Sequence, residues 1–255
     1  MIHHTAIISP AATLAKDLEI GPYCIIGGGV TLASGCHLTH HVSLQGPSSF
    51  GARNIFHPFC SIGNKTQDLK YTGEPTLLEV GEDNEFREFV TVNRGTAPGE
   101  KTIIGSHNLF LTYSHVAHNC EVGNYCILSN NGTLAGHVIV EDYAIISGLA
   151  AVHQFCRIGQ HSLVGGCTKI VKDVPPYFIA DGNPAEISAV NLVGLQRRNF
   201  SDEDIQTIRA AFKKFCDPKL NTSQAMQALT EEFPDSPHVQ NLINFVNNSQ
   251  RGVIR

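Results

Sequence analysis

The chain has 255 residues, only 16% of them charged, and its 18 Lys and Arg against 23 Asp and Glu give a formal charge of −5. This balance argues against nucleic acid as a main partner, because phosphate binding needs a basic surface. Since no apolar run approaches the ~18 residues of a membrane helix and the first residues carry no secretory signal, we expect a cytoplasmic protein with no integral membrane segment.

A six-residue repeat dominates the first two thirds of the chain. Every sixth residue from Ile2 to Ile170 is apolar, except at Asp68, Glu74 and Pro98. A period of six is typical of a parallel β-helix, in which three short strands and their tight turns form a coil of about 18 residues. Six cysteines share one position of the repeat, and we expect them to be reduced, buried core residues: Cys24, Cys36, Cys60, Cys120, Cys126 and Cys156.

The three exceptions fall in two segments that we interpret as loops leaving the coil. The first runs from about Asn64 to Leu78 and the second from Arg94 to Thr102. Loops on a rigid scaffold are where ligand contacts concentrate. Both loops are therefore candidates for substrate binding.

Helices are predicted after the repeat ends. Pro175-Pro176 and Asn183-Pro184 interrupt the chain there, so we divide it into a β-helix domain over 1–175 and a helical domain over 176–255. We expect one helix to carry Ile187, Val190 and Leu195, a second to start at a cap formed by Ser201, and two more near 222–233 and 237–250. Such a domain would cover the unpaired strand edges at the end of the coils.

Three histidines are predicted to gather on one face of neighbouring coils. Residues 18 apart should lie directly above one another, which aligns His118 with Gly136, beside His137, and with Gln154, beside His153; His115 is three residues before His118. Chance stacking is the alternative, because the chain has 13 histidines. A metal site is disfavoured. Metal-binding solenoids of the carbonic-anhydrase type use a His-x4-His pair, but no two histidines here differ by five positions, and no CxxC pair occurs. This leaves a histidine of this cluster as a general base and the amide of Gly136, one coil from His118, as an oxyanion donor.

Several segments together carry a resemblance to a known family. They are Ser114-His115-Val116-Ala117-His118-Asn119-Cys120, Leu134-Ala135-Gly136-His137, Ala151-Val152-His153-Gln154-Phe155-Cys156, Asp173-Val174-Pro175-Pro176-Tyr177 and Gly194-Leu195-Gln196-Arg197-Arg198. The chain resembles the hexapeptide-repeat acyltransferases that transfer an acyl chain from acyl carrier protein to UDP-N-acetylglucosamine in the first step of lipid A biosynthesis. The resemblance implies a left-handed parallel β-helix, a homotrimer with active sites between subunits, and catalysis without a metal or bound cofactor.

The resemblance also implies roles for individual residues. His118 would take a proton from the sugar 3-hydroxyl, which attacks the thioester of an (R)-3-hydroxyacyl chain, and the Gly136 amide would hold the oxyanion. Gly166 would act as a ruler that leaves room for a long acyl chain. Substrate contacts are expected at Asp68, Lys70, Asn93, His115, His137, His153, Gln154, Asn191, Arg197 and Arg198. For the two arginines, the alternative is a solvated helix end.

Three positions depart from the family pattern. Asn119 replaces an Asp after the base, Asn93 stands where His is common, and Val193 stands where Glu is common. An amide cannot stabilise imidazolium as a carboxylate does, so another group could orient His118. An amine nucleophile depends less on a strong base, and N-acylation of the 3-amino analogue of the sugar is therefore an alternative hypothesis. An acyl-CoA-dependent transferase and a non-enzymatic scaffold are two further alternatives.

Overall fold

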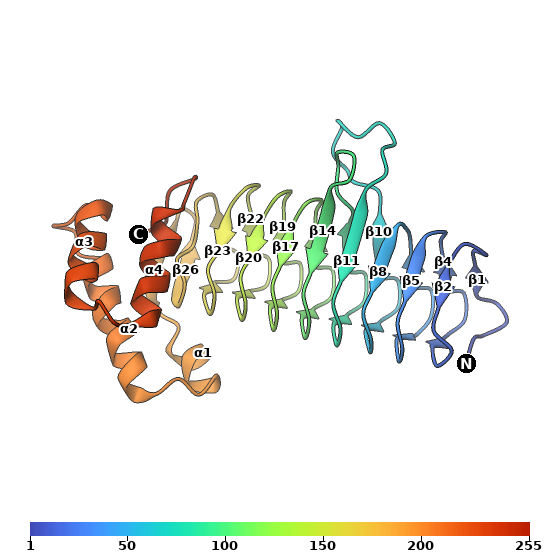
Figure 1. Ribbon diagram of the computed structural model, residues 1–255, viewed down its shortest axis with the longest axis horizontal. Coiled ribbons are helices and arrows are strands. Elements are labelled where there is room, and N and C mark those ends of the chain that lie inside the picture. The colour runs from blue at the N-terminus through green and yellow to red at the C-terminus, as the bar shows by residue number, and fades with distance from the viewer.

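Stacked coils of short parallel strands and tight turns make up residues 7–170 of the computed structural model, which describes residues 1–255. Successive strands join three different sheets in turn, and the coils stack along one axis (Figure 1). The β1 sheet contains β1 (Ile7–Ile8), β4 (Ile25–Ile26), β7 (Ser43–Leu44), β10 (Ser61–Asn64), β13 (Thr91–Asn93), β16 (His115–Val116), β19 (Thr133–Leu134), β22 (Ala151–Val152) and β25 (Lys169–Ile170). The parallel β-helix predicted from the six-residue repeat is confirmed.

The other two sheets complete each coil. The β2 sheet contains β2 (Thr13–Leu14), β5 (Val30–Leu32), β8 (Ser48–Phe50), β11 (Leu77–Val80), β14 (Lys101–Ile104), β17 (Glu121–Val122), β20 (Ile139–Val140) and β23 (Arg157–Ile158). The β3 sheet contains β3 (Glu19–Ile20), β6 (His37–Leu38), β9 (Ile55–Phe56), β12 (Glu85–Phe86), β15 (Leu109–Phe110), β18 (Ile127–Leu128), β21 (Ile145–Ile146), β24 (Leu163–Val164), β26 (Phe178–Gly182) and β27 (Ala185–Val190).

The interior of the coils is filled by the repeating apolar residues. Each points inward because the side chains of a strand alternate between its two faces. Phe56, Phe86 and Phe110 stack on one another, with ring centroids 5.2 and 4.8 Å apart. The six cysteines that share a repeat position are buried free thiols, as predicted.

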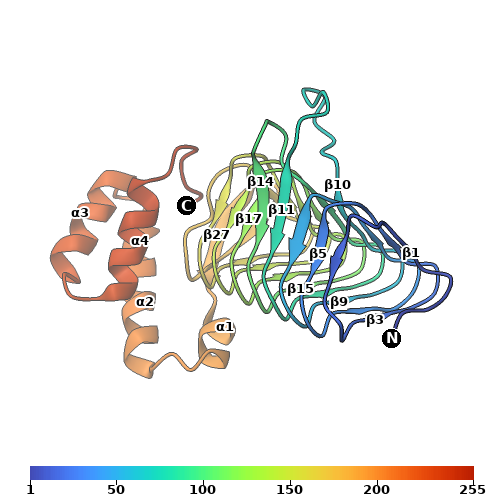
Figure 2. The same ribbon diagram turned by 45° about the vertical axis from the view of Figure 1, so that its right-hand side comes forward.

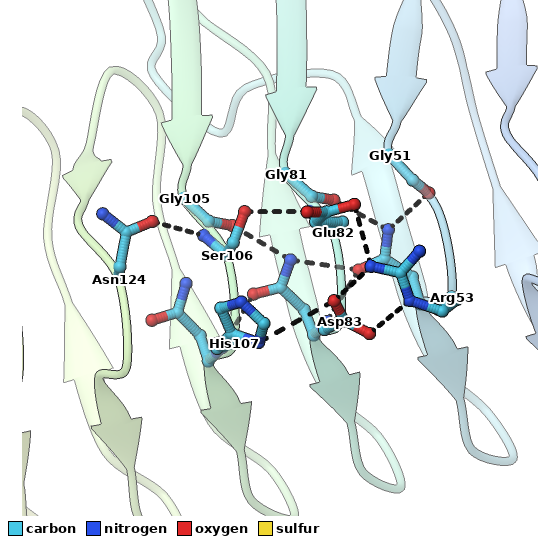
Figure 3. Close-up of polar contacts among 12 residues, drawn as sticks. Gly51, Arg53, Gly81, Glu82, Asp83, Gly105, Ser106, His107 and Asn124 are labelled. Carbon is cyan, nitrogen blue, oxygen red and sulfur yellow. Dashed lines mark hydrogen bonds and ion pairs between the residues drawn. The ribbon is translucent and has the colours of Figure 1, made fainter.

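Polar side chains hold the corner at which the β2 sheet passes to the β3 sheet. On its outer side, the Arg53 guanidinium donates to the Asp83 carboxylate at 2.8 and 2.6 Å, and His107 Nδ1 lies 3.8 Å from the same group (Figure 3). Beneath it, buried Asn84 donates its backbone N–H to Asn54 Oδ1 at 2.9 Å, while Asn84 Oδ1 accepts the N–H of Asn108 at 2.9 Å. This ladder satisfies buried backbone groups from one coil to the next.

Two loops leave the coils where the repeat fails. Residues 65–76 connect β10 to β11, residues 94–100 connect β13 to β14, and both project from the same side of the β-helix (Figures 1 and 2). The Thr96 hydroxyl donates to the Thr66 hydroxyl at 3.0 Å and ties the two loops together. Both loops were therefore predicted within two residues of their observed ends.

The C-terminal region covers one end of the β-helix with helices (Figures 1 and 2). They are α1 (Leu192–Arg197), α2 (Asp202–Phe215), α3 (Thr222–Glu232) and α4 (Pro237–Asn247), and they pack on Tyr177 and Phe178. Ser201 caps α2 by accepting the N–H of Asp204, as predicted. The helix expected to carry Ile187 and Val190 is wrong for these two residues, because they lie in β27, which pairs antiparallel with β26 beyond the division at 175. None of the four helices combines the length and the apolar surface that a membrane span requires.

Candidate active site

His118 lies at the corner where the β1 sheet passes to the β2 sheet, on the same side as the two loops. Register pairs His115 with Thr133, so His118 lies directly below Gly136 in the next coil. A Cβ added to Gly136 would come within 2.5 Å of Cε1 and Nε2 of the His118 ring. The Gly136 N–H makes no backbone hydrogen bond. The alignment of His118 with Gly136 expected from residues 18 apart is thus present in the structure.

Two further histidines lie near this pair, and a third lies in the following coil. The His137 ring stands at 89° to the His118 ring with centroids 5.2 Å apart. His115 lies 2.7 Å from the Thr91 hydroxyl through Nδ1. Burial lowers the pKa of both His115 and His137, and the nearby His118 lowers both pKa values further, so these rings favour the neutral form. His153 and Gln154 lie exposed in the following coil.

The first loop brings a carboxylate to His118. Asp68 Oδ2 lies 3.9 Å from His118 Nε2, while Asp68 Oδ1 accepts the backbone N–H of Lys70 at 2.9 Å. The Lys70 side chain is exposed beside it. Asn93 is placed differently, because it is only 5% exposed and its Nδ2 donates to the Lys65 carbonyl at 2.9 Å. Asn93 therefore holds the first residue of the first loop in place.

The second loop contributes a residue that sequence reasoning missed. His118 Nδ1 lies 3.0 Å from Asn119 Oδ1, and Asn119 Nδ2 donates to Glu100 Oε2 at 2.7 Å. A hydrogen bond from the Ala97 N–H, followed by that from Asn119, holds the pKa of Glu100 below its ordinary value. Glu100 is 18 residues before His118, so the count that aligned Gly136 with His118 would have found it if run backwards.

A second group of residues, three of them predicted, forms a cavity on the outer face of the β3 sheet. Its floor is apolar, and Tyr143, His161, Asn191, Arg197 and Arg198 stand around it. Asn191 is only 4% exposed, and both ends of its amide have partners. Its Oδ1 accepts the Gly194 N–H at 3.1 Å, and its Nδ2 donates to the His161 carbonyl at 2.9 Å. The Arg198 guanidinium lies 4.7 Å from the Tyr143 ring centroid. The cavity is thus lined by cations that a phosphate can bind.

These groups of residues lie on different sides of one chain. In a coil of three sheets, the corner that holds His118 faces away from the β3 sheet, which carries the arginine cavity. Gly166 lies at a third place, between β24 and β25, where an added Cβ would meet only the Gly148 carbonyl oxygen at 3.5 Å. No group of three or more His, Cys, Asp or Glu side chains is arranged to hold a metal ion.

Comparison with known proteins gives consistent matches over the full chain. Residues 173–254 match the family model described as UDP-N-acetylglucosamine O-acyltransferase, domain 2. The chain is 44% identical over 256 residues to the acyl-[acyl-carrier-protein]–UDP-N-acetylglucosamine O-acyltransferase of Stutzerimonas stutzeri, with 100% of this chain and 99% of the relative covered. It is also 44% identical over 255 residues to the enzyme of the same name from Thermodesulfovibrio yellowstonii, at the same coverage.

Solved structures agree with these relatives. The UDP-N-acetylglucosamine acyltransferase of Bacteroides fragilis matches with a TM-score of 0.97 at 40% identity, covering 100% of both chains. The corresponding protein of Acinetobacter baumannii matches with a TM-score of 0.96 at 43% identity, covering 100% of this chain and 99% of that one. The similarity therefore includes the coils, both loops and the helical region.

Proposed function

The chain belongs to the UDP-N-acetylglucosamine O-acyltransferase family, and from this premise we propose how its own residues perform the reaction. It transfers an acyl chain from acyl carrier protein to UDP-N-acetylglucosamine, the first step of lipid A biosynthesis. We assign the chemistry to the corner that holds His118. The observation that carries this assignment is the His118 ring packed against Gly136, whose N–H makes no backbone hydrogen bond, with Asp68 Oδ2 3.9 Å from His118 Nε2.

In the proposed mechanism, His118 is the general base. Nε2 accepts the proton of the sugar 3-hydroxyl as its oxygen attacks the thioester carbon of an (R)-3-hydroxyacyl chain. The Gly136 N–H stabilises the tetrahedral oxyanion, a contribution of roughly 3 kcal/mol for one donor. The carbon–sulfur bond then breaks, and the imidazolium returns the proton to the departing thiolate of acyl carrier protein. The ester and the free thiol are the products, and His118 is neutral again.

Substrate positioning is proposed for both loops and the histidine cluster. Asp68 and Lys70 would contact the sugar nucleotide, and His115, His137, His153 and Gln154 would line the cleft. Because Asn93 is buried under the first loop, its support for sugar binding is indirect, through the position of that loop. Arg197 and Arg198 would bind the phosphates, and Asn191 would hold α1 in place beneath them.

A homotrimer is proposed because the two halves of this site lie on opposite sides of one chain. A neighbouring copy that places its β3 sheet against the His118 corner would bring its arginines and Gly166 toward the base of the first subunit. Chains carrying His118→Ala and chains carrying Arg198→Ala should then be inactive alone and regain activity when co-assembled, since some interfaces pair two intact halves. A site built within one chain would show no recovery.

Product analysis tests the chemistry. Purified protein receives (R)-3-hydroxyacyl thioesters of acyl carrier protein with UDP-N-acetylglucosamine, its 3-amino analogue, or both, and the product is identified by mass spectrometry. We expect the ester of the hydroxyl sugar, and loss of it in His118→Ala but not in the control His107→Ala at another corner. Preference for the amino sugar would support the N-acyl alternative, and unchanged transfer by His118→Ala would remove His118 as the base.

A further inference from the structure

Asn119 has a fixed orientation beside His118. Its Oδ1 lies 3.0 Å from His118 Nδ1 and also accepts the backbone N–H of Thr96 at 3.1 Å, while its Nδ2 donates to Glu100 Oε2 at 2.7 Å. A flipped amide would set its NH₂ against the Thr96 N–H and its oxygen against a carboxylate. Both neighbours therefore require the same orientation.

This orientation determines which nitrogen of His118 carries the proton. An amide oxygen only accepts, so the contact with Asn119 Oδ1 requires a proton on Nδ1 of His118. Nε2 then has a free lone pair, and it is the nitrogen that lies over Gly136 and faces Asp68. The tautomer needed for proton abstraction is thus selected by Asn119, and the direction of the Asn119 amide is selected by Glu100.

Glu100 is anchored independently of the histidine. Its Oε2 accepts the Ala97 N–H at 2.9 Å as well as the Asn119 amide, and it stands at the end of the second loop, just before β14. Hydrogen bonds from these two donors lower the pKa of Glu100, so its carboxylate is ionised at neutral pH. The negative charge of Glu100 is consequently separated from His118 by the side-chain amide of Asn119.

We propose that Glu100 is a positioning residue for acyl transfer, acting through the Asn119 amide to hold His118 with Nδ1 protonated and Nε2 free. This inference rests on His118 being the base. The amide transmits part of the carboxylate's effect, because the hydrogen bond to Glu100 polarises Asn119 and strengthens its oxygen as an acceptor. The pair Asn119–Glu100 thus performs together what a carboxylate beside the base would perform alone.

The experiment is a double-mutant cycle at positions 100 and 119, with kcat and KM measured for both substrates. Glu100→Ala frees the Asn119 amide, and we expect kcat to fall about 10- to 100-fold with little change in KM. Asn119→Asp in the wild-type background sets a second carboxylate against Glu100 and should also lower kcat. In the Glu100→Ala background, the same Asn119→Asp change should restore kcat, because a carboxylate then contacts His118 without an opposing charge.

The pH profile provides a second readout. Glu100→Gln keeps an oxygen that can accept from Ala97 and Asn119 but removes the charge, so the imidazolium is less stabilised. We expect the acidic limb of the kcat profile to move to lower pH. Other groups near His118 are unchanged in this variant: Asp68 and Lys70 on the first loop, His115 on β16 and His137 in the next coil.

The controls separate this inference from the proposed function and from simple destabilisation. Glu79→Gln removes a carboxylate that pairs with Lys101 at 2.9 Å on the neighbouring strand, and it should leave kcat and its pH profile unchanged. If Glu100→Ala has wild-type kcat, or if Asn119→Asp does not rescue it, the positioning role is wrong. If His118→Ala retains activity, the proposed function itself fails, whatever the Glu100 variants do.

Discussion

Gly136→Ala should disable the enzyme while leaving it folded. The added Cβ would lie 2.5 Å from Cε1 and Nε2 of His118, whereas carbon atoms in contact are about 3.5–4.0 Å apart. The ring must therefore retreat by about 1 Å, and a displacement of that size can lower a rate about 100-fold. Retreat also strains the 3.0 Å contact between His118 Nδ1 and Asn119 Oδ1.

We expect kcat of Gly136→Ala to fall about 100-fold, which corresponds to about 2.7 kcal/mol of transition-state stabilisation. The free energy of unfolding should fall by only about 1 kcal/mol, the low end for overpacking, because the His118 side chain is 13% exposed and can move toward solvent. The assay is the initial rate of ester formation at saturating substrates, with a thermal unfolding curve for each variant.

Gly28→Ala is the matched control. Gly28 has the same position in an earlier coil, where a Cβ would meet only Ser9 Oγ at 3.4 Å and Ala11 Cβ at 3.6 Å. This variant should keep both wild-type kcat and wild-type stability. A Gly136→Ala enzyme with kcat within twofold of wild type would refute the placement of the His118 ring over Gly136 as a determinant of catalysis.

Three further predictions concern stability and chain length. Asn84→Ala leaves the half-buried Gly105 carbonyl and the buried Asn108 N–H without their 2.9 Å partners, so urea denaturation should show that the free energy of unfolding falls by about 3 kcal/mol, unlike Asn130→Ala at the surface. Burial, followed by Arg198, lowers the pKa of His161 from 6.5 to about 4. As the pH falls, the unfolded chain therefore binds this proton before the folded chain does, and the free energy of unfolding should fall by about 2 kcal/mol between pH 7 and pH 5. A His161→Phe variant that kept this loss would show that His161 does not cause it. Gly166→Met should shift the preferred donor to a shorter acyl chain, and unchanged preference among the thioesters would remove the ruler role of Gly166.

The coils were predictable because the inside of a β-helix imposes burial on every sixth residue. Asp68, Glu74 and Pro98 marked the loops for the same reason, since none of them suits the interior. The region of Ile187 and Val190 was not predictable in this way. Their spacing of three fits a helix, and only pairing with β26, whose position depends on the end of the coils, makes that segment a strand.

The site was predictable where the coils are uninterrupted. From His118 to Gln154 no residue leaves the repeat, so counting by 18 aligned His118 with Gly136 correctly. Asp68 and Glu100 lie in loops, whose course over the corner depends on contacts such as that between Thr66 and Thr96. The distance from Asp68 to His118 therefore could not be obtained from the spacing of the repeat alone, whereas Glu100, 18 residues before His118, is aligned with it by that spacing.

The two asparagines that depart from the family pattern have a common physical explanation in these loops. Asn119 Nδ2 donates to the Glu100 carboxylate at 2.7 Å, and Asn93 Nδ2 donates to the Lys65 carbonyl at 2.9 Å. An Asp at position 119 would set one oxygen against another, so an amide there is required by Glu100 and not by the nucleophile, while at position 93 the Lys65 carbonyl requires a side chain that donates. Asn93 and Asn119 consequently do not by themselves indicate an amine acceptor. Each is explained by a loop oxygen to which its Nδ2 donates, the Lys65 carbonyl for Asn93 and the Glu100 carboxylate for Asn119.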